Sequence, residues 1–275
     1  MNSFQKIKDN TLLGLIYIAT FLTLGILVWI IGYVMINGLS QVNWEFLSTN
    51  PVGEEGGVLP MIASTFYIVI LSLLIATPIG IGAAIYLVEY AKPGKLVRAI
   101  RFCTESLAGI PSIIFGLFGM IFFVTILKLG FSLLAGAFTV SMMVLPTIIR
   151  TTEESLKSVP NAFREGSYGL GASKLRTIVK IILPSSIPGI LAAVILSVGR
   201  VVGETAALYF TAGMVPRMPT SIMDSGRTLS IHMYLLAKEG VSFQKSFATA
   251  TVLIIFVAVI NFAANRIANA LNKFK

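Results

Sequence analysis

The chain has 275 residues, of which 56% are hydrophobic and only 12% are charged, and its mean hydropathy is +0.87. This composition excludes an ordinary soluble domain and indicates a polytopic membrane protein. With one cysteine, Cys103, and one histidine, His232, the chain cannot form an internal disulfide or a metal site built from several Cys and His ligands.

Long apolar runs predict six membrane spans, because about 20 helical residues at 1.5 Å each cross a hydrocarbon core of roughly 30 Å. We place them at residues 12–36, 60–88, 106–127, 129–149, 184–210 and 246–268. The third and fourth are expected to form a tight hairpin, since the sequence LKLG around Lys128 is the best turn in that apolar stretch. The first run is too long for a signal peptide and is expected to be a retained helix.

Lysine and arginine predict the orientation of the spans, because cytoplasmic loops are enriched in both. Fifteen of the 21 basic residues fall on one side of a six-span chain: Lys6, Lys8, Lys92, Lys95, Arg98, Arg101, Arg150, Lys157, Arg164, Lys174, Arg176, Lys180, Arg266, Lys273 and Lys275. That side, with both termini, is therefore expected to be cytoplasmic. Anionic lipid then accounts for the net charge of +9 without a nucleic-acid partner.

The opposite side would hold two longer segments. Residues 37–59 contain Glu45, Glu54 and Glu55 but no basic residue, and residues 211–245 include His232, expected to be an ordinary interfacial side chain. On the cytoplasmic side, Glu89 and Glu105 lie close to predicted span ends. They are expected to pair at the surface with neighbours such as Lys92 and Arg101.

The segment 150–183, RTTEESLKSVPNAFREGSYGLGASKLRTIVKIIL, predicts two or three short cytoplasmic helices. Thr151 and Glu154 have the spacing of a capping box, Pro160 restarts the chain, and Gly169 and Gly171 break it again. Apolar residues recur throughout the segment, including Leu156, Val159, Phe163, Tyr168 and Leu170. These helices therefore need a protein surface to cover them.

The same segment carries a fixed spacing of Glu165, Gly171, Ile181, Leu183 and Pro184. It resembles the EAA loop of ABC importer membrane subunits, in which a short helix docks in a groove of the ATPase subunit. Gly166 and Ser167 stand where that pattern has two alanines, and both are small enough to preserve close approach. The resemblance implies that these seven residues couple the chain to a separate ATPase.

No phosphate-binding loop of the form G-x-x-x-x-G-K-[ST] occurs in the sequence. The chain is therefore expected to bind no cofactor and not to be an enzyme itself. ATP and magnesium would be held by the partner ATPase, and no metal site is expected here.

Four further stretches resemble the PstA-type permeases of phosphate importers: TPIGIGAAIYLVEYA (77–91), LAGIPSIIFGLFG (107–119), RTTEESLKSVPNAFREGSYGLGA (150–172) and GETAALYFTAG (203–213). The likeness runs from about residue 58 to about residue 265. It implies an all-α, type I (MetI-like) permease fold in a bacterial or archaeal cell membrane. Its implied partners are membrane lipid, a homologous PstC-type permease, an ATPase dimer and an extracytoplasmic phosphate-binding protein.

Two regions are expected on this basis. Residues 1–59 would form an N-terminal tail, the first transmembrane helix and an external loop. Residues 60–275 would form the importer's transmembrane domain with its coupling loop at 150–183.

Arg200 and Glu204 stand inside the apolar run 187–210, where each charge costs roughly 2.5–3.5 kcal/mol near mid-membrane. As i and i+4 residues of one helix they would share a face and neutralise each other. Gly199 and Gly203 form a G-x-x-x-G beside them, continued by Ala207, which predicts packing against another helix.

Two roles for the charged pair stay open. It could be a polar clamp between helices, or Arg200 could offer its donor fork to phosphate oxygens in transit. In the second case Glu204 would hold the arginine between anions, and Thr205 would add a hydroxyl donor. These three residues are the predicted substrate pathway.

The sequence thus favours a permease subunit that moves inorganic phosphate inward with a homologous partner. One alternative is the same machine carrying sulfate, phosphonate or an amino acid. The other is an ion-coupled secondary carrier, which should show internal repeats that we do not see and would leave the segment after Arg150 without a purpose.

Overall fold

The computed structural model describes residues 3–51 and 56–272, so Glu54, Glu55, Lys273 and Lys275 lie outside the described residues. Every regular element in these ranges is helical, which confirms the predicted all-α class. The α-helices are α1 (Ser3–Leu39), α2 (Trp44–Ser48), α3 (Leu59–Ile85), α4 (Lys95–Ala108), α5 (Ser112–Gly119), α6 (Leu133–Ser158), α7 (Asn161–Gly169), α8 (Lys174–Thr177), α9 (Leu183–Gly203), α10 (Ala206–Tyr209), α11 (Leu229–Lys238) and α12 (Phe243–Asn272). Three π-helical turns, Tyr86–Tyr90, Met120–Ile126 and Ile178–Ile182, adjoin α3, α5 and α9.

Five helical segments are long and apolar enough to cross a membrane: Asn10–Leu39, Leu59–Tyr90, Leu133–Ser158, Lys174–Gly203 and Phe243–Arg266. Two shorter pieces, Lys95–Ala108 and Ser112–Ile126, pass the same test only together and are bent by 102°, so they count as a sixth span if taken as one broken crossing. The predicted third span, 106–127, is therefore wrong as a single helix. Pro111 stands at the bend and cannot donate a backbone hydrogen bond, so the helix breaks there.

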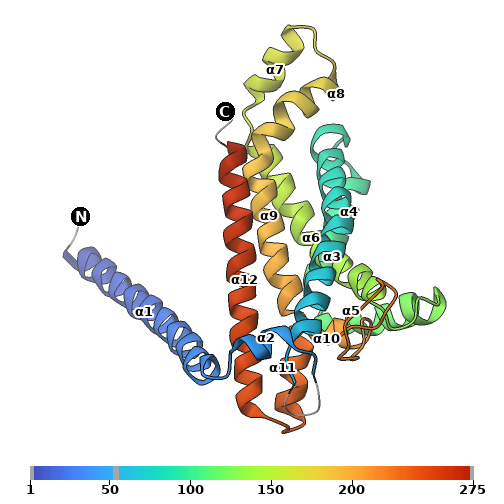
Figure 1. The fold of residues 1–275 in the computed structure, drawn as a ribbon. Helices are drawn as coiled ribbons and strands as arrows, with labels where there is room; N and C mark the ends of the chain where they lie inside the picture. Colours follow the sequence, from blue (N-terminus) through green and yellow to red (C-terminus); the bar gives the residue numbers. More distant parts are fainter. Residues whose placement is uncertain (1–2, 52–55, 273–275) are drawn as a thin grey trace.

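The two ends of the bundle differ, and Figure 1 shows α7 and α8 at one end and α11 at the other. We name them the α7 end and the α11 end. The bent pair joins the two ends. The π-helical turn after α3 lies at the α7 end, because its Glu89 accepts from Arg164 of α7. The start of α6 lies at the α11 end, because Leu133 N donates to Asp224 O in the segment before α11. With the bent pair counted as one span, the described residues contain six candidate spans, and the tight turn at Lys128 connects that pair to α6.

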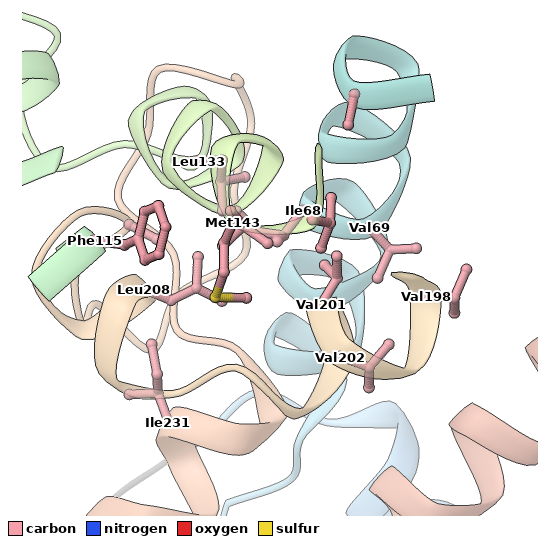
Figure 2. Close-up of a cluster of buried hydrophobic side chains, with 14 of the residues drawn as sticks. Ile68, Val69, Phe115, Leu133, Met143, Val198, Val201, Val202, Leu208 and Ile231 are labelled. Carbon is pink, nitrogen blue, oxygen red and sulfur yellow. The ribbon is translucent and has the colours of Figure 1, made fainter. Parts of the chain in front are cut away.

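The core lies where α3, α6 and α9 pack together, with α5, α10 and α11 covering it toward the α11 end. Figure 2 shows its side chains, among them Ile68 of α3, Met143 of α6 and Val201 of α9. By contrast, α1 packs mainly along α12, and nearly all its side chains from Asn10 to Leu39 are exposed, so it extends away from the bundle (Figure 1).

Two predicted boundaries need correction. The fifth span ends at Gly203 and not at residue 210, because Glu204 has extended backbone with ψ 127°. Thr151 and Glu154 do not cap a new helix, since both lie inside α6, which continues to Ser158. The apolar core of α6 and its charged last two turns form one uninterrupted helix, which projects the charged turns beyond the apolar part.

Candidate functional site

The turn after α7 is a Schellman motif centred on Gly171. Gly171 has φ +78°, a conformation that favours glycine, and its N–H donates to Tyr168 O at 2.9 Å. Ala172 N donates to Ser167 O at 3.1 Å, which completes the motif. The predicted redirection of the chain at this glycine is present in the structure.

The three residues at the EAA position lie differently. Glu165 and Gly166 are exposed, and a Cβ added to Gly166 would meet open space. Ser167 is buried, and its hydroxyl lies 2.8 Å from that of Thr177 in α8. The small third position therefore lets α7 and α8 meet, while the first two are presented outward.

The other predicted coupling residues lie where the chain enters α9. Ile181 packs on a buried cluster made by Ala84, Leu156, Val159 and Ile182. Leu183 and Pro184 are half-buried at the start of α9, directly after the π-helical turn. Because proline cannot donate to the carbonyl four residues back, the looser π turn fits the backbone just before Pro184.

An open groove of about 510 Å³ runs between α7 and the start of the α9 span. Gly166, Ser167, Gly171 and Ile181 of the predicted set line it, together with Leu170 and others. Leu170 is 91% exposed, and Phe163 is 51% exposed. An apolar surface this accessible at the end of a membrane bundle is typical of a contact site for another protein.

The sequence did not reveal how α7 is attached to the bundle. Arg164 donates through Nη2 and Nε to Glu89 Oε1, at 2.7 and 3.1 Å, and also to the carbonyls of Leu156 and Val159. Glu89 was expected to pair at the surface with residues such as Lys92, but its side chain is only 5% exposed. This clamp fixes α7 to the ends of α3 and α6, and 75 residues of chain separate its partners.

A second cluster lies between α4 and α6, beside a groove of about 420 Å³. Glu153 is buried, and its Oε1 accepts from both Arg101 and Lys157 at 2.6 Å. Arg101 was expected at the surface near Glu105, so its true partner is another correction. This bridge ties α4, which is otherwise largely exposed, to the charged turns of α6.

Arg200 is half-buried in the last turn of α9. Its neighbours Val201 and Val202 pack with Val140 and Met143, midway along the apolar part of α6 (Figure 2 shows Met143 and both valines). The four ion pairs found among the described residues do not include Arg200, and it makes no hydrogen bond within that part of the chain. A guanidinium is thus available at mid-depth of the bundle.

The sequence suggests that Glu204 neutralises Arg200, but the structure shows no contact between the two side chains. The helix ends between them, and the buried Glu204 carboxylate instead accepts from Ala207 N at 2.9 Å, capping α10. Its carbonyl accepts from Ser230 Oγ at 2.6 Å. Thr205 is half-buried, and its hydroxyl has only a long contact of 3.5 Å with Gly203 O.

The small-residue stripe is uncovered in the described chain. Cβ atoms added to Gly199 or Gly203 would meet nothing within 4 Å, and Leu196 on the same face is 61% exposed. The stripe stops there, because Ala207 is buried against Gly116 of α5. Within residues 3–51 and 56–272, the face of α9 that carries Gly199 and Gly203 therefore has no other helix packed against these glycines.

A model of the family described as binding-protein-dependent transport system inner membrane component matches residues 76–274. The chain belongs to this family. It is 36% identical to the phosphate transport system permease protein PstA of Pasteurella multocida, covering 94% of each chain. It is also 34% identical to the probable ABC transporter permease protein YqgI of Bacillus subtilis, covering 94% of this chain and 95% of that one. The resemblance to PstA-type permeases is confirmed.

Solved structures show the same fold. A chain of a bacterial ABC transporter involved in alginate import superposes with a TM-score of 0.68 at 17% identity, covering 97% of this chain and 98% of that one. A chain of the inward-facing methionine transporter MetNI gives 0.60 at 23% identity, covering 78% and 94%. The permease therefore has the expected MetI-like architecture and is a multi-pass membrane protein, which argues against the secondary-carrier alternative.

Proposed function

We propose that this permease forms half of the translocation pathway of an ATP-driven importer of inorganic phosphate. The observation that carries the proposal is that Arg200, which has no partner among the described residues, lies beside an uncovered face of α9 at mid-depth of the bundle. A planar donor fork suits phosphate oxygens, and an arginine facing lipid at this depth would be costly. The PstA name of relatives about 35% identical supports the same substrate.

A homologous permease, of the PstC type, would cover the open face of α9. The G-x-x-x-G stripe permits close approach of a second helix, and Arg200 at its edge would then line a path between the two subunits. Glu204 would act mainly by fixing the break between α9 and α10, since its carboxylate caps α10. Thr205 would present its weakly engaged hydroxyl near the same path.

The α7 end would face the cytoplasm, because the basic loops lie there. A separate ATPase dimer would bind and hydrolyse ATP with magnesium and would dock on α7. The exposed Glu165 and Gly166 and the groove below Leu170 fit such a contact. The Arg164–Glu89 clamp would pass the movement of α7 to the ends of α3 and α6, and a phosphate-binding protein would dock at the opposite end, outside a bacterial or archaeal cell membrane.

The test is reconstitution of this chain with its ATPase and a PstC-type partner in liposomes, followed by measurement of ATP-dependent phosphate uptake. Arg200→Lys should keep assembly intact and lower uptake, because lysine lacks the planar fork. Unchanged uptake would refute the anion contact. Competition by excess sulfate, phosphonate or amino acid for uptake would instead identify the machine as an importer of another solute.

Bulky replacements of Glu165 or Gly171 test the coupling surface separately. Glu165→Trp should detach or uncouple the ATPase, while the amount of the permease inserted in the membrane should stay normal. Full ATP-driven transport by that variant would exclude the docking role.

A further inference from the structure

Three basic residues lie near one another at the α11 end, one just before α11, one in α11 and one in the first turn of α12 (the two helices adjoin in Figure 1). They are Arg227, His232 and Lys245, and together they are called the basic cluster. Arg227 Nη1 lies 3.4 Å from His232 Nδ1. Ser246, next to Lys245, donates to the carbonyl of Met233, next to His232, at 3.0 Å. His232 is only 8% exposed, so it is not the ordinary interfacial side chain that the sequence suggested.

Several hydrogen-bond donors of the basic cluster have no acceptor among the described residues. The Lys245 Nζ atom is buried and has no hydrogen-bond partner in the described chain. Arg227 donates Nε to Met214 O at 2.8 Å and Nη1 to His232, which leaves Nη2 without a partner in the same residues. His232 accepts at Nδ1 from this arginine, so its proton lies on Nε2 and can be donated.

The charges of the cluster are consistent with that arrangement. Burial, and then the positive charges of Arg227 and Lys245, lower the pKa of His232 to about 4, so the ring is neutral at neutral pH. Burial also lowers the pKa of Arg227, and the nearby Glu239 opposes this shift. Glu239 is exposed and takes part in none of the ion pairs among the described residues. Two cations therefore share a partly buried site in which no carboxylate of the described residues forms an ion pair with them.

We propose that Arg227, His232 and Lys245 form a binding site for a tetrahedral oxyanion, a phosphate group, at the α11 end of the permease. The cluster offers an ammonium, a guanidinium nitrogen without a partner among the described residues and an imidazole N–H as donors, and a phosphate has several oxygens that can accept from such groups. A buried ammonium without an acceptor is costly, and a bound anion removes that cost.

The position of the cluster links it to the pathway, a step that rests on the proposed function and its orientation. Ser230, in the same turn of α11 as His232, donates to the carbonyl of Glu204 at 2.6 Å. The cluster is thus joined through one short helix to the break next to Arg200. With the α11 end facing outward, it would be the first anion site that phosphate meets after leaving the binding protein, before it reaches Arg200.

The binding test uses the assembled transporter in a detergent and buffer free of phosphate groups. Thermal unfolding is followed while inorganic phosphate is titrated, at constant ionic strength, for the unaltered protein, Lys245→Gln and Lys245→Arg. Lys238→Gln is the matched control, because Lys238 is an exposed lysine of the same region whose Nζ stacks on Tyr234. Loss of one charged hydrogen bond should raise the phosphate concentration for half-maximal stabilisation about tenfold in Lys245→Gln and leave the control unchanged.

Phosphate uptake in liposomes provides the second readout. Lys245→Gln should raise the concentration for half-maximal uptake with little change in the maximal rate, whereas Lys245→Arg should retain most of the affinity. If the unaltered protein takes up phosphate but Lys245→Gln matches it in both experiments, the site is refuted while the proposed function stands. If the unaltered protein takes up no phosphate, the proposed function fails.

A further arm identifies the source of the phosphate group. Phosphatidylglycerol is added to the detergent in place of inorganic phosphate. Stabilisation by the lipid alone would show a headgroup site and overturn the role in transport. Stabilisation that requires the binding protein and not phosphate would show that the cluster seats a carboxylate of that protein, which also overturns the proposal.

Discussion

Arg164→Ala removes the side chain that holds α7 to the bundle. The Arg164 and Glu89 side chains are 15% and 5% exposed, and their closest atoms are 2.7 Å apart. Losing one partner of a buried pair costs about 3–5 kcal/mol, because the remaining charge is left without compensation. The carbonyls of Leu156 and Val159 also lose their donor. We therefore expect α7 to detach locally while the bundle stays folded.

Hydrogen exchange of the backbone amides of α7, in the assembled transporter, measures this directly. A loss of about 3 kcal/mol corresponds to exchange more than roughly a hundredfold faster. Arg150→Ala is the matched control, since Arg150 pairs with Glu154 at 3.2 Å but their side chains are 71% and 65% exposed. Such a pair contributes at most about 0.5 kcal/mol. Equal exchange rates in the two variants would refute the clamp. The double variant Arg164→Met with Glu89→Leu should cost less than the two single changes together.

Three further outcomes are expected. Gly171→Ala should destabilise the coupling turn by roughly 1 kcal/mol through its positive φ, seen as faster protease cleavage there; unchanged cleavage would contradict this. Gly116→Val should lower the melting temperature and disturb the break at α10, because a Cβ lies 2.8 Å from Ala207 Cα, whereas Gly82→Ala, in open space, should be neutral. His232 is buried neutral with a pKa of about 4, against 6.5 when unfolded, so stability in phosphate-free buffer should be full above pH 6.5. The contribution of His232 should fall by up to about 3 kcal/mol toward pH 4, and His232→Gln should remove that part of the pH dependence from melts across that range.

Much of the fold could be predicted because the apolar runs and their breaks are local properties of the sequence. The positions of α3, α6, α9 and α12 and the turn at Lys128 follow from hydropathy and from helix geometry. The break at Pro111 was missed, since an apolar stretch that contains a proline can continue as a kinked helix or bend sharply, and neighbouring elements decide which. The end of α9 was also missed. The residues after Glu204 are apolar, so a prediction from hydropathy alone extends the helix past Gly203.

Some residues of the candidate site could likewise be predicted from local sequence, and others could not. Gly171 and the small Ser167 were identified because a tight turn and a close helix approach restrict the residue types that fit. Arg164 was missed because its buried partner Glu89 lies on another span and no spacing connects them. Glu204 was identified, but its contact was wrong, because the pairing at i and i+4 holds only while both residues stay in one helix.

By itself, the sequence determined the membrane class, the approximate number of membrane spans and the turn at the end of α7. These depend on composition and on residues near each other along the chain. Only the tertiary structure decided that Arg200 has no partner among residues 3–51 and 56–272, that Ala207 packs on Gly116 and that the basic cluster forms around His232. Each of these depends on how separate helices meet, and a helix-forming sequence does not specify its neighbours.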